Sequence, residues 1–151
     1  MEENGTVSEV FPAAENAAAE KGKEEYRPAV AFGEDGIADA RSLALAAGEV
    51  LDRRNGKDIS VLFVGSKINL TDYFVICSGG SETHVRALAD EVEYRLSLSG
   101  VKPDNREGRG DGNSWIVLDY GSVMVHIFTG EARRFYELDR LFPDAEKINT
   151  D

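Results

Sequence analysis

The residues Ser78-Gly79-Gly80-Ser81 follow an apolar run and precede a helical pattern, and they could bind phosphate. Glycines before a helix N-terminus let backbone N–H groups approach an anion. An enzyme that transfers nucleotides would also need paired carboxylates on a neighbouring strand to hold magnesium. Asp119 stands alone on its expected strand, and the sequence has no Walker lysine pattern. We therefore favour a tight strand-to-helix turn capped by Ser81, and we keep a phosphate site as the alternative.

Three other side chains could react or bind a metal. His84 and His126 have no ligand cluster near them in the sequence, so we expect a structural or solvent-facing position and not catalysis or metal binding. Cys77 has apolar neighbours, and as the one cysteine it predicts an inert core thiol and no internal disulfide. We expect no catalytic residue, no metal and no cofactor.

The run that begins at Trp115 is the best candidate for a binding surface. Side chains of a strand alternate between its two faces, so Ile116, Leu118 and Tyr120 share the face that is the better core candidate. Trp115 and Asp119 then lie on the other face. Tryptophan is common at the centre of protein interfaces. Packing of Trp115 under the terminal helix is the alternative interpretation.

The elements that would position these residues form an α+β pattern. Gly121-Ser122 has the composition of a two-residue hairpin turn, and the order of elements predicts a mixed five-stranded sheet with flanking helices. We expect helices over residues 37–54, 81–99 and 131–142, and strands over 59–64, 73–77, 104–107, 115–120 and 123–128.

The terminal helix has an apolar stripe of Phe135, Leu138 and Phe142, which we expect to pack on the sheet. Arg133 and Glu137 are spaced as an i,i+4 pair. Tyr136 falls outside this stripe and could contact a partner at the surface.

The charge of the chain restricts its partners. The net charge is −11, which disfavours direct DNA or RNA binding. It would suit a basic protein partner, but the charge alone is better explained by plain solubility. Residues 1–36 hold nine acidic and three basic residues, and we expect them to form a disordered acidic tail. The domain would then cover residues 37–143, with a second tail over 144–151. No apolar run reaches the roughly 18 residues that span a membrane, and no targeting signal is evident, so we expect a cytoplasmic protein.

Several motifs, in unbroken order, resemble the ribosomal silencing factor (Iojap-like) family. The resemblance covers about residues 38–143. The chain departs from the family in ending the last motif with Leu141-Phe142 where Leu-Trp is frequent, and in its longer N-terminal tail. The matching segments are Asp58-Ile59, 71–79, His84-Val85, Ala89-Asp90, Val92, Glu107-Gly108, 115–121, 123–128 and 133–141.

This resemblance implies a nucleotidyltransferase-like fold without catalytic carboxylates. It also implies a protein that binds protein number fourteen of the large ribosomal subunit and blocks joining of the small subunit, so that translation falls when nutrients are scarce. A role in large-subunit biogenesis, a nucleotide-transferring enzyme and a homodimer of the free protein stay open as alternatives. The partner-binding residues expected from the resemblance and the strand pattern are Trp115, Asp119, Glu107, Asp72, His126 and Tyr136.

Overall fold

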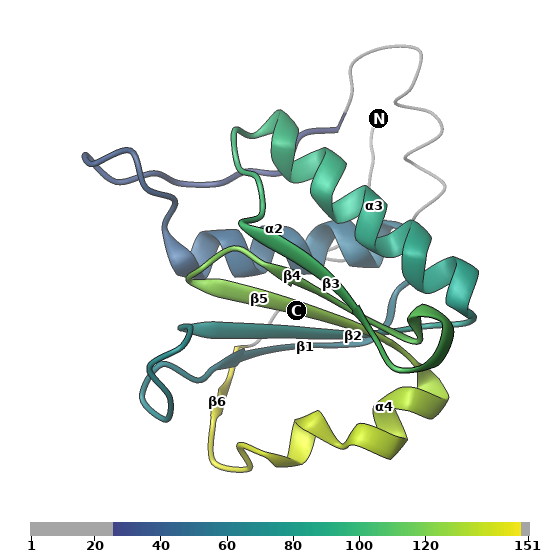
Figure 1. Cartoon of the computed structure of the whole chain (residues 1–151). Coiled ribbons are helices and arrows are strands. Elements are labelled where there is room, and N and C mark those ends of the chain that lie inside the picture. The colour runs from purple at the N-terminus through teal and green to yellow at the C-terminus, as the bar shows by residue number, and fades with distance from the viewer. Residues whose placement is uncertain (1–25, 149–151) are drawn as a thin grey trace, which may run out of the picture.

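The computed structural model describes residues 26–148, which form a mixed sheet with helices on both faces (Figure 1). Helix α2 (Ala40–Arg53) begins where the Asp39 carboxylate accepts the Ser42 N–H at 2.9 Å. Its buried face includes Leu43, Ala47, Val50 and Leu51, as the spacing predicted.

Helix α3 (Glu82–Leu98) lies beside α2 on the same face of the sheet. The Ser81 hydroxyl accepts the His84 N–H at 3.1 Å, so the predicted serine cap is confirmed. The predicted stripe of α3 is fully buried: Val85, Leu88, Ala89, Val92 and Leu96.

Among the described residues, six strands form the sheet, in the order β3-β4-β5-β2-β1-β6. The α+β class and the mixed sheet are confirmed, but the expected number of five strands was wrong. The additional strand β6 pairs with Leu62 and Phe63 inside the segment that we had assigned to a C-terminal tail. The strands are β1 (Lys57–Phe63), β2 (Tyr73–Gly79), β3 (Asn105–Arg109), β4 (Trp115–Asp119), β5 (Val123–Thr129) and β6 (Glu146–Lys147).

The central strands β2 and β5 run parallel, and the other pairs described are antiparallel. The chain leaves β2 towards α3 on one face and leaves β5 towards α4 (Gly130–Tyr136) on the opposite face (Figure 1). The two carboxyl ends, Gly79 and Thr129, are directly paired. The nucleotidyltransferase-like topology itself stays a prediction.

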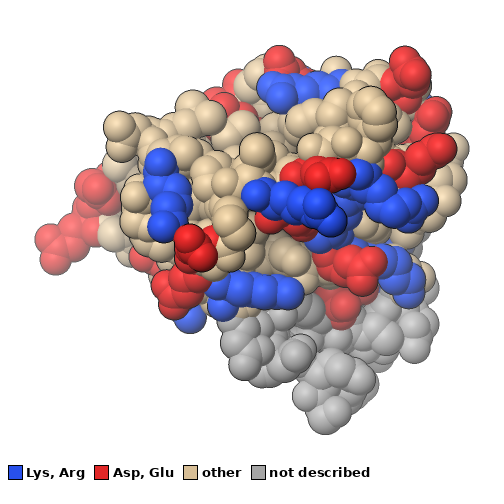
Figure 2. Space-filling model, turned by 90° about the horizontal axis from the view of Figure 1, so that it is seen from below, with Lys and Arg blue, Asp and Glu red and all other residues tan. Residues whose placement is uncertain are grey.

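The face under α4 holds a second, smaller core. Phe74, Ile76 and Phe128 of the central strands pack there with Ala132 and Leu138. Figure 2 looks at this side and shows basic and acidic side chains interleaved around uncharged surface. The ribbon view shows that α4 covers only part of this face of the sheet (Figure 1).

The terminal helix is shorter than expected. Helix α4 ends at Tyr136, Glu137 adopts a left-handed conformation with φ 53°, and a 3-10 turn (Leu138–Arg140) follows. Because of this break, the residues of the predicted stripe do not share one face. Leu138 packs on the sheet, whereas Phe135 is 77% exposed. The expected Arg133–Glu137 pair was also wrong, because the Arg133 guanidinium instead binds Asp139 at 2.9 Å.

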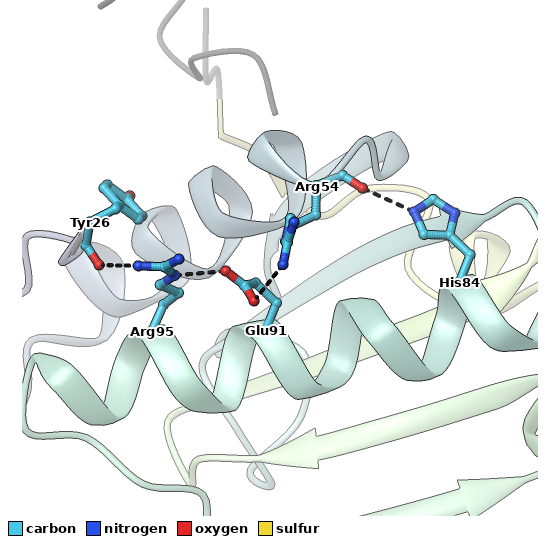
Figure 3. Close-up of polar contacts among 5 residues, drawn as sticks. All are labelled: Tyr26, Arg54, His84, Glu91 and Arg95. Atoms are coloured by element: carbon cyan, nitrogen blue, oxygen red, sulfur yellow. Dashed lines mark hydrogen bonds and ion pairs between the residues drawn. The ribbon is translucent and has the colours of Figure 1, made fainter. Parts of the chain in front are cut away.

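Residues 26–36, which we expected to belong to a disordered tail, form a strap across α2 and α3. The Tyr26 carbonyl accepts the Arg95 guanidinium at 2.9 Å, and Glu91 joins Arg95 to Arg54 (Figure 3). The Arg53 guanidinium lies 3.5 Å from the centroid of the Tyr26 ring. The remainder of the expected tail, residues 1–25, lies outside the described residues.

Candidate functional site

Trp115 begins β4 on the face of the sheet that α4 covers. Across the strand pair it lies opposite Phe128, and the two rings stack with centroids 4.8 Å apart. Ile116, Leu118 and Tyr120 point to the opposite, main core, as the alternation predicted. Trp115 is only partly buried, so one part of its ring supports the fold and another part faces solvent.

His126 holds the Trp115 ring from the side. The indole Nε1–H donates to His126 Nδ1 at 3.2 Å, and the histidine is only 3% exposed. Burial, with the nearby Arg109 charge adding to it, lowers the pKa of His126 to about 3, so the ring is neutral and able to accept. His126 therefore orients Trp115 and, at this burial, does not itself form a surface for a partner.

Tyr136, at the end of α4, extends the aromatic contact outwards. Its ring lies 4.7 Å from Trp115 and 5.0 Å from Phe135, by centroids. Tyr136 and Phe135 are 40% and 77% exposed. We call Trp115, Tyr136 and Phe135 the aromatic surface. Its geometry supports both interpretations of Trp115, because the ring packs beside the terminal helix and also contributes to an exposed patch.

A charged pair on the edge strand borders the aromatic surface. Glu107 accepts the Arg109 guanidinium at 2.7 Å, and that guanidinium lies 5.1 Å from the Trp115 ring centroid. Such a cation over an indole face is attractive. Glu107 therefore lies near Trp115, as expected, but Arg109 already neutralises its charge.

The loop before β4 approaches the aromatic surface closely. Gly110 has φ +72°, and a Cβ there would lie 2.5 Å from the Ser114 hydroxyl oxygen and 3.2 Å from the Tyr136 oxygen. A larger residue would therefore push against Tyr136 as well as strain the backbone. This places the glycine-rich loop next to the candidate site.

Asp119 and Asp72 lie away from this group, at the other end of the strands. The Asp119 carboxylate accepts the Gly121 N–H at 2.8 Å and so stabilises the hairpin turn, where Gly121 has φ +83°. Asp72 donates its N–H to the Ser122 carbonyl beside the same turn. The structure therefore brings Trp115, Tyr136 and Glu107 together at one end of the sheet, over the buried His126, and Asp119 with Asp72 at the other.

The hypothesis of a nucleotide-transferring enzyme needs Asp119 close to the Gly79-Gly80-Ser81 turn, but the two lie far apart. Gly79 pairs with Thr129, whereas Asp119 pairs with Met124, five positions back along β5. At about 3.3 Å per residue this is roughly 16 Å. Asp119 is therefore too distant to act with the Gly79-Gly80-Ser81 turn. Within residues 26–148 no group of three or more His, Cys, Asp or Glu side chains could hold a metal ion.

Sequence reasoning missed Arg109 and Phe135 at this surface. Arg109 could have been found from the hairpin register, because it faces Trp115 across the β3–β4 pair. Phe135 was assigned to the core by helical periodicity, and the left-handed Glu137 could not be anticipated from its residue type. No helix in the described part of the chain is both long and apolar enough to cross a membrane.

The fold and the surface thus define a small α+β domain with an aromatic face of the kind that binds another macromolecule. A family model described as "Ribosomal silencing factor during starvation" matches residues 37–151. The chain belongs to the ribosomal silencing factor family.

Individual relatives agree with this assignment. The ribosomal silencing factor of Bacillus subtilis is 31% identical over 111 residues, which cover 74% of this chain and 93% of that protein. A mouse protein named "Mitochondrial assembly of ribosomal large subunit protein 1" is 33% identical over 96 residues, 62% of this chain and 42% of its own length. A crystal structure from Chromobacterium violaceum superposes with a TM-score of 0.66 at 28% identity, covering 70% of this chain and 87% of that one.

Proposed function

We propose that this protein binds the large ribosomal subunit through protein number fourteen and prevents the small subunit from joining. Its membership of the silencing factor family supports a role in translation, and the names of its relatives point to the ribosome and its large subunit. The observation that carries the site assignment is the exposed aromatic surface around Trp115.

The aromatic surface has the physical character of an interface anchor. Phe128 and His126 fix the Trp115 ring before binding, so little side-chain entropy remains to be lost when a partner covers it. Tyr136 and Phe135 add apolar area at its rim. Rigid aromatic residues with this support often dominate binding energies.

Net charge favours encounter with a basic ribosomal protein. The chain carries −11, and complementary charge raises association rates more than it raises affinity. The Glu107–Arg109 pair beside Trp115 leaves the contact itself nearly neutral. We expect charge to guide the approach and the aromatic surface to provide the affinity.

Steric exclusion needs no chemistry from the bound protein. A domain of about 115 residues has a radius of gyration of roughly 13 Å. Bound on the face that meets the small subunit, such a body occupies space that a close subunit interface would need.

The decisive experiment is co-sedimentation with isolated large subunits. We expect Trp115→Ala to weaken binding about thirtyfold, because a central aromatic anchor contributes on the order of 2 kcal/mol. Ile37→Ala is the matched control, since Ile37 is 66% exposed but lies before α2 on the other side of the sheet. Tyr136→Ala provides a second variant at the site with less effect on the core.

Circular dichroism and thermal unfolding should establish that each variant is folded. A folded Trp115→Ala protein that binds like the wild type would remove this surface from the interface. A wild-type protein that binds large subunits but leaves their joining to small subunits unchanged in a sucrose gradient would contradict the steric mechanism. Sedimentation equilibrium of the free protein tests whether the same surface forms a homodimer.

A role in large-subunit assembly is the second candidate, because the mouse relative carries that function in its name. Both roles would use the same surface and differ in timing. Depletion of the protein from growing cells should leave mature large subunits unchanged if silencing is the main role. Accumulation of incomplete large subunits would favour assembly instead.

A further inference from the structure

A cavity of about 630 Å³ opens at the carboxyl ends of β2 and β5. Gly79 and Gly80 line one side of it, and Gly130 and Arg133 of α4 line another. It is distinct from the aromatic surface, since neither Trp115 nor Tyr136 is among its lining residues. Its volume is within the range of sites that bind small molecules.

The position of this cavity follows from the topology. The strands β2 and β5 are parallel neighbours, and the chain leaves them towards opposite faces, to α3 and to α4 (Figure 1). In sheets with parallel strands, a crevice forms at such a switch point, and ligands bind there.

The charge of the cavity lining differs from that of the whole protein. Four cationic side chains face three anionic ones, a net of +1, whereas the chain carries −11. The cations are Lys57, Arg133, Arg134 and Arg140, and the anions are Asp58, Glu137 and Asp139.

Arg133 forms the fixed wall of the cavity. Its guanidinium donates to the Asp58 carbonyl at 2.7 Å and to the Ser78 hydroxyl at 3.0 Å, and it pairs with Asp139. These contacts join α4 to the ends of β1 and β2, so the cavity keeps its shape without a ligand. They also leave Arg133 little capacity to bind an anion.

Lys57 and Arg134 provide the available positive charge. Both are exposed, and neither has an ion pair within residues 26–148. Arg140 contributes a third cation that is only loosely held, 3.4 Å from Glu137 and 81% exposed. Asp58 is the one carboxylate of the lining without an ion pair among these described residues, and it offsets one of the three charges.

The turn before α3 leaves room for an anion but does not supply the binding groups. The Gly80 N–H donates to His84 Nδ1 at 2.9 Å, and Ser81 caps the helix. Gly80 leaves open space beside this turn, whereas a Cβ at Gly79 would lie only 3.0 Å from the Val85 side chain of α3, so that glycine allows close packing of the helix. An anion would therefore be held by the Arg134 and Lys57 side chains.

We propose that this cavity binds a phosphate group of a small molecule, with Arg134 and Lys57 as its principal contacts. Arginine and lysine are the usual side chains for phosphate, and their charge-assisted hydrogen bonds are strong. A small ligand is favoured over RNA because both binding groups line one local cavity, while the net charge of −11 repels a long polyanion.

Isothermal titration calorimetry of the full chain with pyrophosphate tests the proposal. We expect measurable binding that weakens about tenfold in Arg134→Gln and in Lys57→Gln, and that is lost in the double variant. Arg86→Gln is the matched control, because Arg86 is an exposed arginine of α3 outside the cavity. The control should bind pyrophosphate as the wild type does.

Parallel titrations with adenosine triphosphate and with a short RNA distinguish the sources of phosphate. Tighter binding of the nucleotide than of pyrophosphate would support the proposal and add the nucleoside to the ligand, and equal binding would support recognition of phosphate alone. Three results would overturn the proposal of a phosphate site. They are no heat with either pyrophosphate or adenosine triphosphate, binding of the RNA alone, and equal weakening of binding by Arg86→Gln. Ribosome co-sedimentation of Arg134→Gln is a separate readout, so failure here is distinguishable from failure of the docking proposal.

Discussion

At the scale of single residues, Trp115 is held on two sides before any partner arrives. Phe128 stacks under its ring, and His126 accepts its indole N–H. The hydrogen bond requires a neutral histidine, because a protonated ring would present a donor at Nδ1. The exposed aromatic surface therefore depends on His126, a buried residue that is itself almost inaccessible to solvent.

The pKa of His126 makes the stability of the fold dependent on pH. It is lowered to about 3 in the folded protein by burial and by Arg109, against about 6.5 in the unfolded chain. Between these values only the unfolded state takes up the proton, so stability is complete above about pH 6.5 and falls as the pH decreases. We expect a loss approaching 1.4 kcal/mol per pH unit below pH 6.

Urea unfolding between pH 5 and pH 7 measures this loss of stability. The His126→Gln variant should show a smaller loss, because glutamine does not titrate in this range but can still accept the Trp115 N–H. The Arg133 hydrogen bond lowers the pKa of Asp139 below its usual value of 3.8. The contribution of Asp139 to folding stability is therefore lost only at lower pH, where its carboxylate becomes protonated. The chosen range avoids that contribution. An unchanged pH dependence in His126→Gln would show that His126 is not the responsible group.

The candidate site could be predicted from sequence only in part. Alternation placed Trp115 on the face away from the main core, and this was correct. The same reasoning did not predict that His126 is buried or that Asp119 accepts a hydrogen bond within the hairpin turn. The burial of His126 results from Phe74 and the α4 face, and Asp119 is occupied by the Gly121 N–H, which are tertiary and turn details.

At the scale of elements, the end of α4 determines which aromatic residues reach solvent. Glu137 adopts a left-handed conformation that is unfavourable for a residue with a Cβ, and the chain then turns towards the sheet. Arg133 closes the turn by binding Asp139. This break is why Phe135 and Leu138 lie on different surfaces.

Glycine at position 137 should relieve the backbone strain. We expect Glu137→Gly to raise the free energy of unfolding by up to about 1 kcal/mol, because glycine is the preferred residue at a left-handed helix end. The exposed Glu137–Arg140 pair that is lost contributes little. Chemical denaturation measures the change.

Glu131→Gly in the first turn of α4 is the matched control and should lower stability by a similar amount, since glycine is unfavourable inside a helix. Destabilisation by both variants would contradict the assignment of strain to Glu137.

Most elements were predictable because their periodicity is clear. The stripes of α2 and α3 and the alternation of β4 predicted both the type of element and its core face, and the apolar runs of β2 and β5 predicted their type. Strand β6 was not predictable, because two charged residues, Glu146 and Lys147, have no alternating pattern. Its formation depends on pairing with β1 and on burial of Ile148, which is 5% exposed.

At the scale of the whole molecule, the strap of residues 26–36 is an addition to the family domain. The match to the family model begins only at residue 37. Tyr26 and Val30 pack against the main core, and the Ser99 hydroxyl donates to the Pro28 carbonyl at 2.5 Å. The strap thereby connects the outer sides of α2 and α3. The composition of residues 1–36 as a whole predicted disorder, because most of their charge lies before residue 26 and the strap was not considered separately.

Removal of the strap should destabilise the domain. A chain that begins at residue 37 would expose apolar surface under Tyr26 and leave the buried Arg95 without the Tyr26 carbonyl. We expect its free energy of unfolding to be lower by about 2 kcal/mol or more than that of a chain that begins at residue 26. Equal thermal unfolding of the two chains would show that the strap is not structurally important.

The chain contains a single tryptophan, and that residue lies at the proposed interface. Indole emission responds to water and to neighbouring groups, so the wild-type protein carries an intrinsic optical probe at this position. Covering the ring should shift its emission to shorter wavelength and protect it from a soluble quencher such as acrylamide. Docking could thus be followed in real time, without labels, against a purified protein partner that lacks tryptophan.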